Sequence, residues 1–254
     1  MPPVSPPSAS TEPDPIIIES ESPDVAPPVE TRHPQLTPLQ KLLRNLGDFA
    51  LGAGRMAALC LVLTPIVLTA ILVIDIPFRL LDQVFTSAAM RPSGWLTNGH
   101  IVMAFGAMAV ILIARRFGGD EAARTVTAAW SVAAVAAFAE FTYLAPLLEG
   151  GDLPSTRFVV GFVASAMVGQ YVAAAFYDIV RGGEVWWRAP FYALLTAFAV
   201  HVALFYPIAF GASNAPWMAW MVIDFGLKAV MAVAFLGAYA LLRKQLRPRG
   251  GLGG

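Results

Sequence analysis

Five polar side chains stand inside stretches of sequence that are otherwise apolar: Glu140, Gln170, His201, Asp224 and Lys228. Such groups are costly in hydrocarbon, and they normally face the interior of a helix bundle or a water-filled cavity. Carboxylate, amide, imidazole and ammonium groups that share one pocket can bind a small polar ligand through hydrogen bonds and charge. We therefore take these five residues as the candidate substrate-binding set.

Some of these residues also allow a purely structural interpretation. Asp224 and Lys228 are four residues apart, so a helix places them on one face, where they can neutralise each other. That pair could fix helix packing or bind a ligand directly. His201 alone is more typical of a hydrogen-bonded packing residue than of a proton relay, and Gln170 could bond another helix. Glu140 could pair with His201 or Lys228, which would lower the cost of burying it.

The composition indicates a lipid environment. Of the 254 residues, 57% are hydrophobic and 13% are charged, and the mean hydropathy is +0.64. This leaves too little polar surface for a water-soluble protein. A bilayer core needs about 20 consecutive apolar residues per helix. Six stretches qualify, at about 51–76, 96–114, 123–148, 157–180, 190–211 and 216–242. We expect an all-α membrane protein with six transmembrane helices in one compact bundle.

The first 46 residues differ from the rest of the chain. They are rich in proline, serine and acidic residues, and Glu12 to Glu30 contains six acidic residues and no basic one. Such a segment cannot bury enough apolar surface to fold. We therefore expect a disordered tail over 1–46, a helical domain over 47–243 and a short basic, glycine-rich tail over 244–254. The first tail lacks the pattern of a cleaved signal peptide and could contact a membrane-protein partner.

Lysine and arginine placement predicts the orientation, because cytoplasmic loops are enriched in both. Twelve of them fall in the N-terminal flank, the second and fourth loops and the C-terminal tail. The opposite side has three, namely Arg79, Arg91 and Arg157. Both termini are therefore predicted to be cytoplasmic.

Several functions have no support in the sequence. The net charge is zero, which gives no basic field for nucleic acid, and the single cysteine, Cys60, excludes an intrachain disulfide and a cysteine-cluster metal site. Motifs of the types G-x-x-x-x-G-K-S/T, H-E-x-x-H and G-x-S-x-G do not occur. We expect no enzyme activity, no metal ion and no cofactor. Energy for any transport would come from an ion gradient, a partner or metabolic trapping.

Several short motifs follow one another along the chain in an order that is also found in a known family. They are Arg115-Arg116-Phe117-Gly118, Gly169-Gln170, Trp186-Trp187-Arg188-Ala189-Pro190, Ile208-Ala209-Phe210, and Asp224 with Lys228. In this order and spacing, over about 51–242, the chain resembles the bacterial queuosine-precursor transporters, also called the vitamin uptake transporter (VUT) family. The resemblance implies six helices and import of a 7-deazaguanine across the inner membrane.

The chain also departs from the family pattern. Val110 and Ile111 stand where the family has an acidic residue, alanines at 173–175 replace a carboxylate, and His201 stands at an acidic position. These changes remove hydrogen bonds that would recognise a purine-like ligand. Two hypotheses follow. The chain imports a small planar heterocycle through a polar cavity at the middle of the membrane, or it is a transport-inactive member that serves as a scaffold or accessory subunit of a larger membrane complex.

Overall fold

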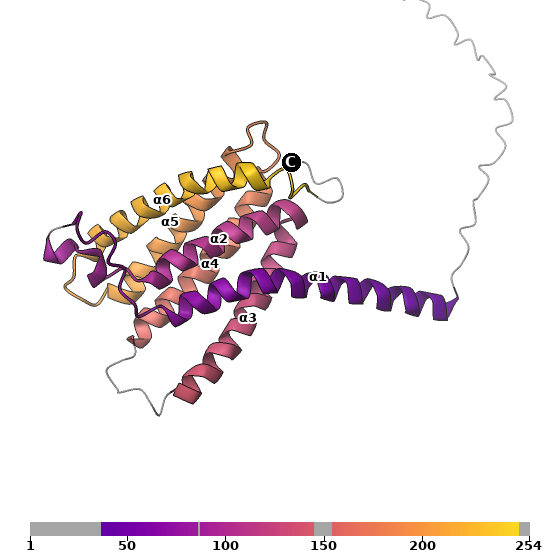
Figure 1. The fold of residues 1–254 in the computed structure, drawn as a ribbon, viewed down its shortest axis with the longest axis horizontal. Coiled ribbons are helices and arrows are strands. Elements are labelled where there is room, and N and C mark those ends of the chain that lie inside the picture. Colours follow the sequence, from indigo (N-terminus) through magenta and orange to yellow (C-terminus); the bar gives the residue numbers. More distant parts are fainter. Residues whose placement is uncertain (1–36, 86, 145–153, 249–254) are drawn as a thin grey trace, which may run out of the picture. The chain divides into compact units, whose positions relative to one another are not determined.

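The protein is an all-α membrane protein, as the composition predicted. The computed structural model describes residues 37–85, 87–144 and 154–248. Within them, six helices are long and apolar enough to cross a membrane. They are α1 (Pro38–Leu72), α2 (Asn98–Phe117), α3 (Gly119–Leu144), α4 (Thr156–Val180), α5 (Arg188–Phe210) and α6 (Trp217–Leu242), with two 3-10 turns at Ala88–Met90 and Pro92–Gly94 (Figure 1).

Helix α1 begins earlier than the predicted span, which started near Leu51. The Thr37 amide donates to Gln40 Oε1 (3.0 Å), and the Gln40 amide donates to Thr37 Oγ1 (3.3 Å). These reciprocal bonds form a capping box, and Pro38 occupies the favoured first position of the helix. Residues 38–46, which the sequence analysis assigned to the tail, are therefore helical and exposed. Residues 1–36 of the predicted tail lie outside the described residues.

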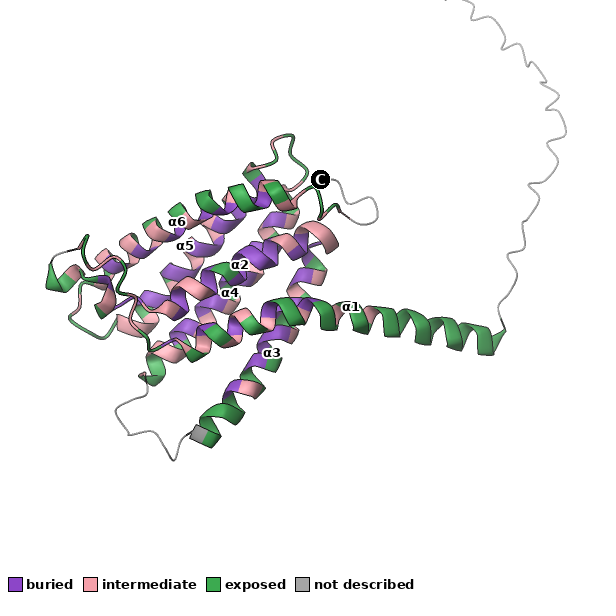
Figure 2. Ribbon diagram, viewed as in Figure 1, coloured by how far each residue is buried: buried purple, intermediate pink, exposed green. Residues whose placement is uncertain are grey.

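The chain divides after Gly47, and the bundle belongs to the unit from Asp48 onward. In this unit α4 packs against α2, α3 and α5, and α5 packs against α6. In the apolar 18-residue stretch of each helix, 56% of the residues are buried in α2 and 22% are buried in α6. Helix α2 is therefore the central helix and α6 a peripheral one, as the burial colours of Figure 2 show.

The start of α2 is held in the bundle by backbone pairing with the segment that follows α1. The Phe78 amide donates to the Leu96 carbonyl (2.9 Å), and the Asn98 amide donates to the Ile76 carbonyl (2.8 Å). A Cβ atom at Gly99 would lie 2.6 Å from the Ala70 carbonyl oxygen, so only glycine fits there. The start of α2 is thus ordered where it crosses α1, and the residue after Gly99 is fully buried.

Helices α4 and α5 meet along small residues of α4. Gly161, Ser165 and Gly169 repeat every four residues, and small residues on one helical face let another helix approach closely. The approach is close here: a Cβ atom at Gly161 would lie 3.2 Å from the Ile208 side chain, and one at Gly169 would lie 3.1 Å from the Ala197 carbonyl oxygen. The close approach brings α5 against the middle of α4.

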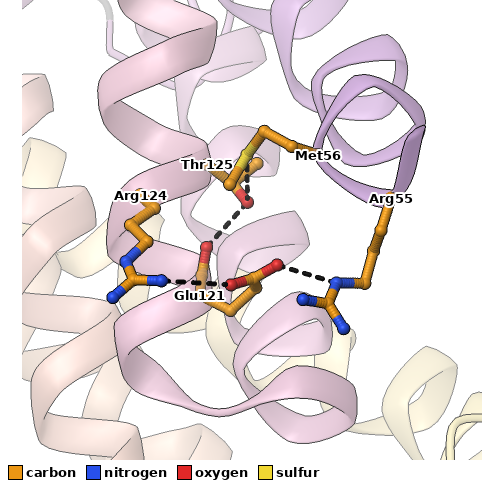
Figure 3. Close-up of polar contacts among 5 residues, drawn as sticks. All are labelled: Arg55, Met56, Glu121, Arg124 and Thr125. Carbon is orange, nitrogen blue, oxygen red and sulfur yellow. Dashed lines mark hydrogen bonds and ion pairs between the residues drawn. The ribbon is translucent and has the colours of Figure 1, made fainter. Parts of the chain in front are cut away.

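A polar contact joins α1 to the first turns of α3 (Figure 3). Arg55 Nε donates to Glu121 Oε1 (2.9 Å), while Arg124 lies farther away, 3.9 Å from Glu121 Oε2. The Thr125 hydroxyl donates to the Glu121 carbonyl (2.8 Å) and lies 3.7 Å from Met56 Sδ. Arg55 lies within a membrane-spanning helix, and the Glu121 carboxylate neutralises its positive charge.

Two alanine substitutions of helical glycines test the packing of α4 on α5. Gly169→Ala places its methyl group against a backbone oxygen that cannot turn aside, so the free energy of unfolding should fall by about 1–3 kcal/mol. Gly226→Ala in α6 meets nothing within 4 Å and should raise it by up to about 1 kcal/mol through helix propensity. Thermal unfolding in detergent measures both. Equal shifts in the same direction would contradict the packing described.

Candidate functional site

A small buried cavity lies among α2, α4, α5 and α6. Its volume is about 20 Å³, which is room for about one water molecule. Four polar side chains line it: His100, Gln170, His201 and Lys228. Each of them is at most 5% exposed. Small residues complete most of the wall, namely Ala104, Ala107, Ala166, Gly169 and Ala197. The structure thus brings three of the five predicted residues to one place.

Asp224 and Lys228 form the ion pair that their spacing predicted. Lys228 Nζ donates to Asp224 Oδ2, and both side chains are buried. Lys228 also lines the cavity, and an ammonium has two further N–H donors. On the other side, Asp224 faces the buried Tyr206 hydroxyl. The two charges neutralise each other, but the Lys228 ammonium can still donate hydrogen bonds to a group in the cavity.

Two histidines face each other at the cavity, with ring centroids 6.1 Å apart and an interplanar angle of 79°. The Ser165 hydroxyl donates its one hydrogen to the Phe162 carbonyl (3.2 Å) and therefore accepts from His201 Nδ1 (3.3 Å). In a neutral ring this leaves His201 Nε2 as an acceptor. His100 Nδ1 bonds the Thr97 hydroxyl (2.9 Å). Both Nε2 atoms are buried, and neither has a hydrogen-bond partner among the described residues.

Gln170 makes the interhelical contact that the sequence left as one of two alternatives. Its Oε1 accepts a hydrogen bond from Trp130 Nε1 (2.9 Å), which links α4 to α3. Its Nε2 lies 3.3 Å from Met103 Sδ, a weak acceptor. A Cβ atom at Gly106 would lie 2.7 Å from that nitrogen, so glycine in α2 makes room for the amide. Gln170 is held by the protein and offers the cavity mainly its NH₂ group.

Glu140 does not reach the cavity. The sequence analysis expected that it could pair with His201 or Lys228, whereas it is exposed one turn before the end of α3 at Leu144. It makes no hydrogen bond or ion pair with any residue that the structure describes. The physical reason is that the second half of α3 is mostly exposed (Figure 2), so its residues have no facing helix. The position of Glu140 within an apolar stretch therefore did not predict that its side chain is buried.

Sequence reasoning missed His100, which is fully buried. It lies in the first turn of α2, a position that normally reaches the membrane surface. The available signal was Gly99, the glycine directly before it, which allows α1 to approach closely. Trp130 and Ser165, which hold Gln170 and His201, were likewise not predicted as parts of the site.

A cleft of about 380 Å³ lies near the start of α2, at the end of the bundle that is predicted to face outward, and we call it the outer cleft. Its lining includes Asp75, Ser93, Trp95, Thr97, Ser155, Phe158 and Phe210. Thr97 joins the cleft to the cavity, because its hydroxyl bonds His100. Aromatic rings surround His100: the rings of Phe205, Phe162 and Phe158 lie 4.5, 5.0 and 5.8 Å from its ring, and we call them the aromatic layer. Because Phe158 lines the cleft and His100 lines the cavity, residues of the two spaces pack directly on each other.

Substitutions at the ion pair should reveal the cost of burying its charges. Asp224→Asn leaves Lys228 buried without a counter-ion and should lower the free energy of unfolding by about 3–5 kcal/mol. Replacing both, Asp224→Leu with Lys228→Met, removes the charges together and should restore most of that loss. Apparent unfolding midpoints in detergent compare the variants. A double variant as unstable as the single one would show that the pair is not the source of the effect.

The chain was also compared with known proteins. No protein-family model, no curated protein and no solved structure matches it. Its function is therefore inferred from the site geometry and from the motifs of the sequence.

Proposed function

We propose that the chain is an inner-membrane importer of a small planar heterocycle, of the 7-deazaguanine kind that the resemblance to queuosine-precursor transporters implies. One observation carries the proposal. Gln170, His201 and Lys228, together with His100, line a single buried cavity in which two ring nitrogens lack a hydrogen-bond partner within the described structure. Unpaired polar atoms that converge in a buried space are what a polar ligand would complete.

The polar groups are suited to the edge of a heterocycle. His201 Nε2 can accept a ring or exocyclic N–H, while the Lys228 ammonium and the Gln170 NH₂ can donate to ring nitrogens or a carbonyl oxygen. Phe198 and the His100 ring add flat surfaces to the same wall. Asp224 fixes the position of Lys228, so that the ammonium is held in place before a substrate arrives.

Import through this site requires movement, since a space of about 20 Å³ cannot hold a two-ring molecule. The outer cleft lies on the route, and the end of α5 carries Phe205 of the aromatic layer and Phe210 of the cleft wall. Pro207 lies between these residues and has no N–H to continue the helical hydrogen bonds. We infer that the last turn of α5 moves to open the cavity outward, in the manner of alternating access.

Uptake of labelled 7-deazaguanine by cells that depend on external precursor tests the proposal. A neutral double variant, Asp224→Asn with Lys228→Met, should lower uptake by at least about tenfold, because a charged donor is lost from the site. Glu140→Gln is the matched control, since this carboxylate lies away from the cavity, and it should transport normally. Membrane levels of each variant are measured in parallel. Wild-type uptake equal to that of cells without the protein would rule out the assignment.

A transport-inactive scaffold is the second candidate, and two observations favour it. The Gln170 carbonyl is already bonded to Trp130, and the cavity holds little more than one water molecule. Under this hypothesis the protein co-purifies with a larger membrane complex, and the double variant at 224 and 228 leaves cellular precursor uptake unchanged. Purification as a monomer that binds a 7-deazaguanine would exclude it.

A further inference from the structure

A second large cleft lies at the opposite end of the bundle from the outer cleft, on the side predicted to face the cytoplasm. This inner cleft has a volume of about 670 Å³ and lies at the ends of α2, α4 and α6, where the loop before α5 forms one wall. Five basic side chains line it, with a single carboxylate, that of Glu184: Arg115, Arg181, Arg243, Lys244 and Arg247. The cleft therefore carries an excess of positive charge.

Two of these arginines keep a buried N–H group without a partner. Arg115 donates from Nη1 to the Tyr239 hydroxyl (3.0 Å) and from Nη2 to the Arg243 carbonyl (3.2 Å), but its Nε is unpaired within the described residues. Arg181 pairs through Nη2 with Asp178 (3.2 Å), whereas its Nη1 has no partner there. The Arg181 side chain is only 14% exposed. Buried unsatisfied donors of a charged group indicate a missing acceptor.

An aromatic stack fixes part of the cleft wall. The Trp186 ring lies parallel to the Tyr239 ring, with centroids 6.3 Å apart, and the Arg243 guanidinium lies 4.8 Å from the centre of the Trp186 ring. The Tyr239 hydroxyl is also bonded to that of Tyr177 (2.8 Å). Cation–π contact holds the arginine in place, so less side-chain entropy is lost when it binds an anion.

The basic residues could instead serve only to satisfy helix ends. Arg115 and Arg116 do donate to backbone carbonyls, those of Arg243 and Arg247, and positive charge near the C-terminal end of a helix is favourable. This explanation accounts for neither the free N–H groups of Arg115 and Arg181 nor the exposed Lys244. A ligand that accepts several hydrogen bonds accounts for all three.

We propose that the inner cleft binds a phosphate group, carried by the headgroup of an anionic phospholipid or by a soluble phosphate compound. Phosphate oxygens accept the paired N–H groups of arginine well, and basic pockets between transmembrane helices on the cytoplasmic side suit anionic headgroups. Trp186 lies just before α5, and indole rings at the ends of membrane-spanning helices favour the headgroup zone. This proposal does not rest on the proposed transport function or on its substrate.

The first experiment measures lipid binding by native mass spectrometry of the purified full chain, titrated with phosphatidylglycerol or with phosphatidylcholine. Wild-type protein should retain phosphatidylglycerol preferentially. Lys244→Gln with Arg247→Gln, both exposed, should weaken that binding by at least about fivefold without loss of folding, and Arg181→Gln should do the same. Arg124→Gln removes an exposed charge at the same end but outside the cleft, so it should bind as wild type.

The second arm distinguishes the source of the phosphate. Inorganic phosphate, compared with chloride at equal ionic strength, is added to lipid-stripped protein, and the unfolding midpoint is measured. A rise for wild type and for Arg124→Gln, but not for the cleft variants, identifies a soluble phosphate ligand. Selective lipid retention without such a rise identifies a headgroup site. If neither ligand is preferred, or if Arg124→Gln behaves like the cleft variants, the proposal is overturned.

Discussion

The buried ion pair of α6 is the constraint on which the bundle depends. Two charges taken out of water cost several kcal/mol each unless they meet at short range and remain covered. The residues of α6 that the structure buries follow one face of the helix: Trp220, Asp224, Lys228, Ala232, Phe235 and Tyr239. Asp224 and Lys228 are the only charges among these six. The pair can be covered only if this face turns toward α5 and α2, so it fixes the rotation of a helix that is otherwise apolar on every side.

That single face of α6 also connects the three sites. Trp220 stacks on Trp95 of the outer cleft with ring centroids 6.0 Å apart, Lys228 lines the cavity, and Tyr239 belongs to the inner cleft. A shift of α6 along or about its axis would therefore change all three places together. The proposed import would need such a shared element, because in alternating access the opening of one side has to accompany the closure of the other.

The parts of the fold that sequence could predict are those set by local patterns. Hydropathy gave the six spans, the four-residue spacing gave the pair of Asp224 and Lys228, and small residues at equal spacing marked the face of α4 that meets α5. His100 was missed because its burial depends on pairing between 76–78 and 96–98, segments that are distant in sequence. Glu140 was misplaced because apolar neighbours in sequence do not reveal whether a helix faces lipid or protein.

Four of the unpaired buried polar atoms lie at the two places where we propose ligands. His100 Nε2 and His201 Nε2 are at the cavity, and the free N–H groups of Arg115 and Arg181 are at the inner cleft. A buried polar atom of this kind costs about 1–3 kcal/mol if nothing completes its hydrogen bonds. The proposed heterocycle would supply partners at the cavity, and the proposed phosphate would supply them at the inner cleft, so the two proposals account for this cost with ligands of different chemistry.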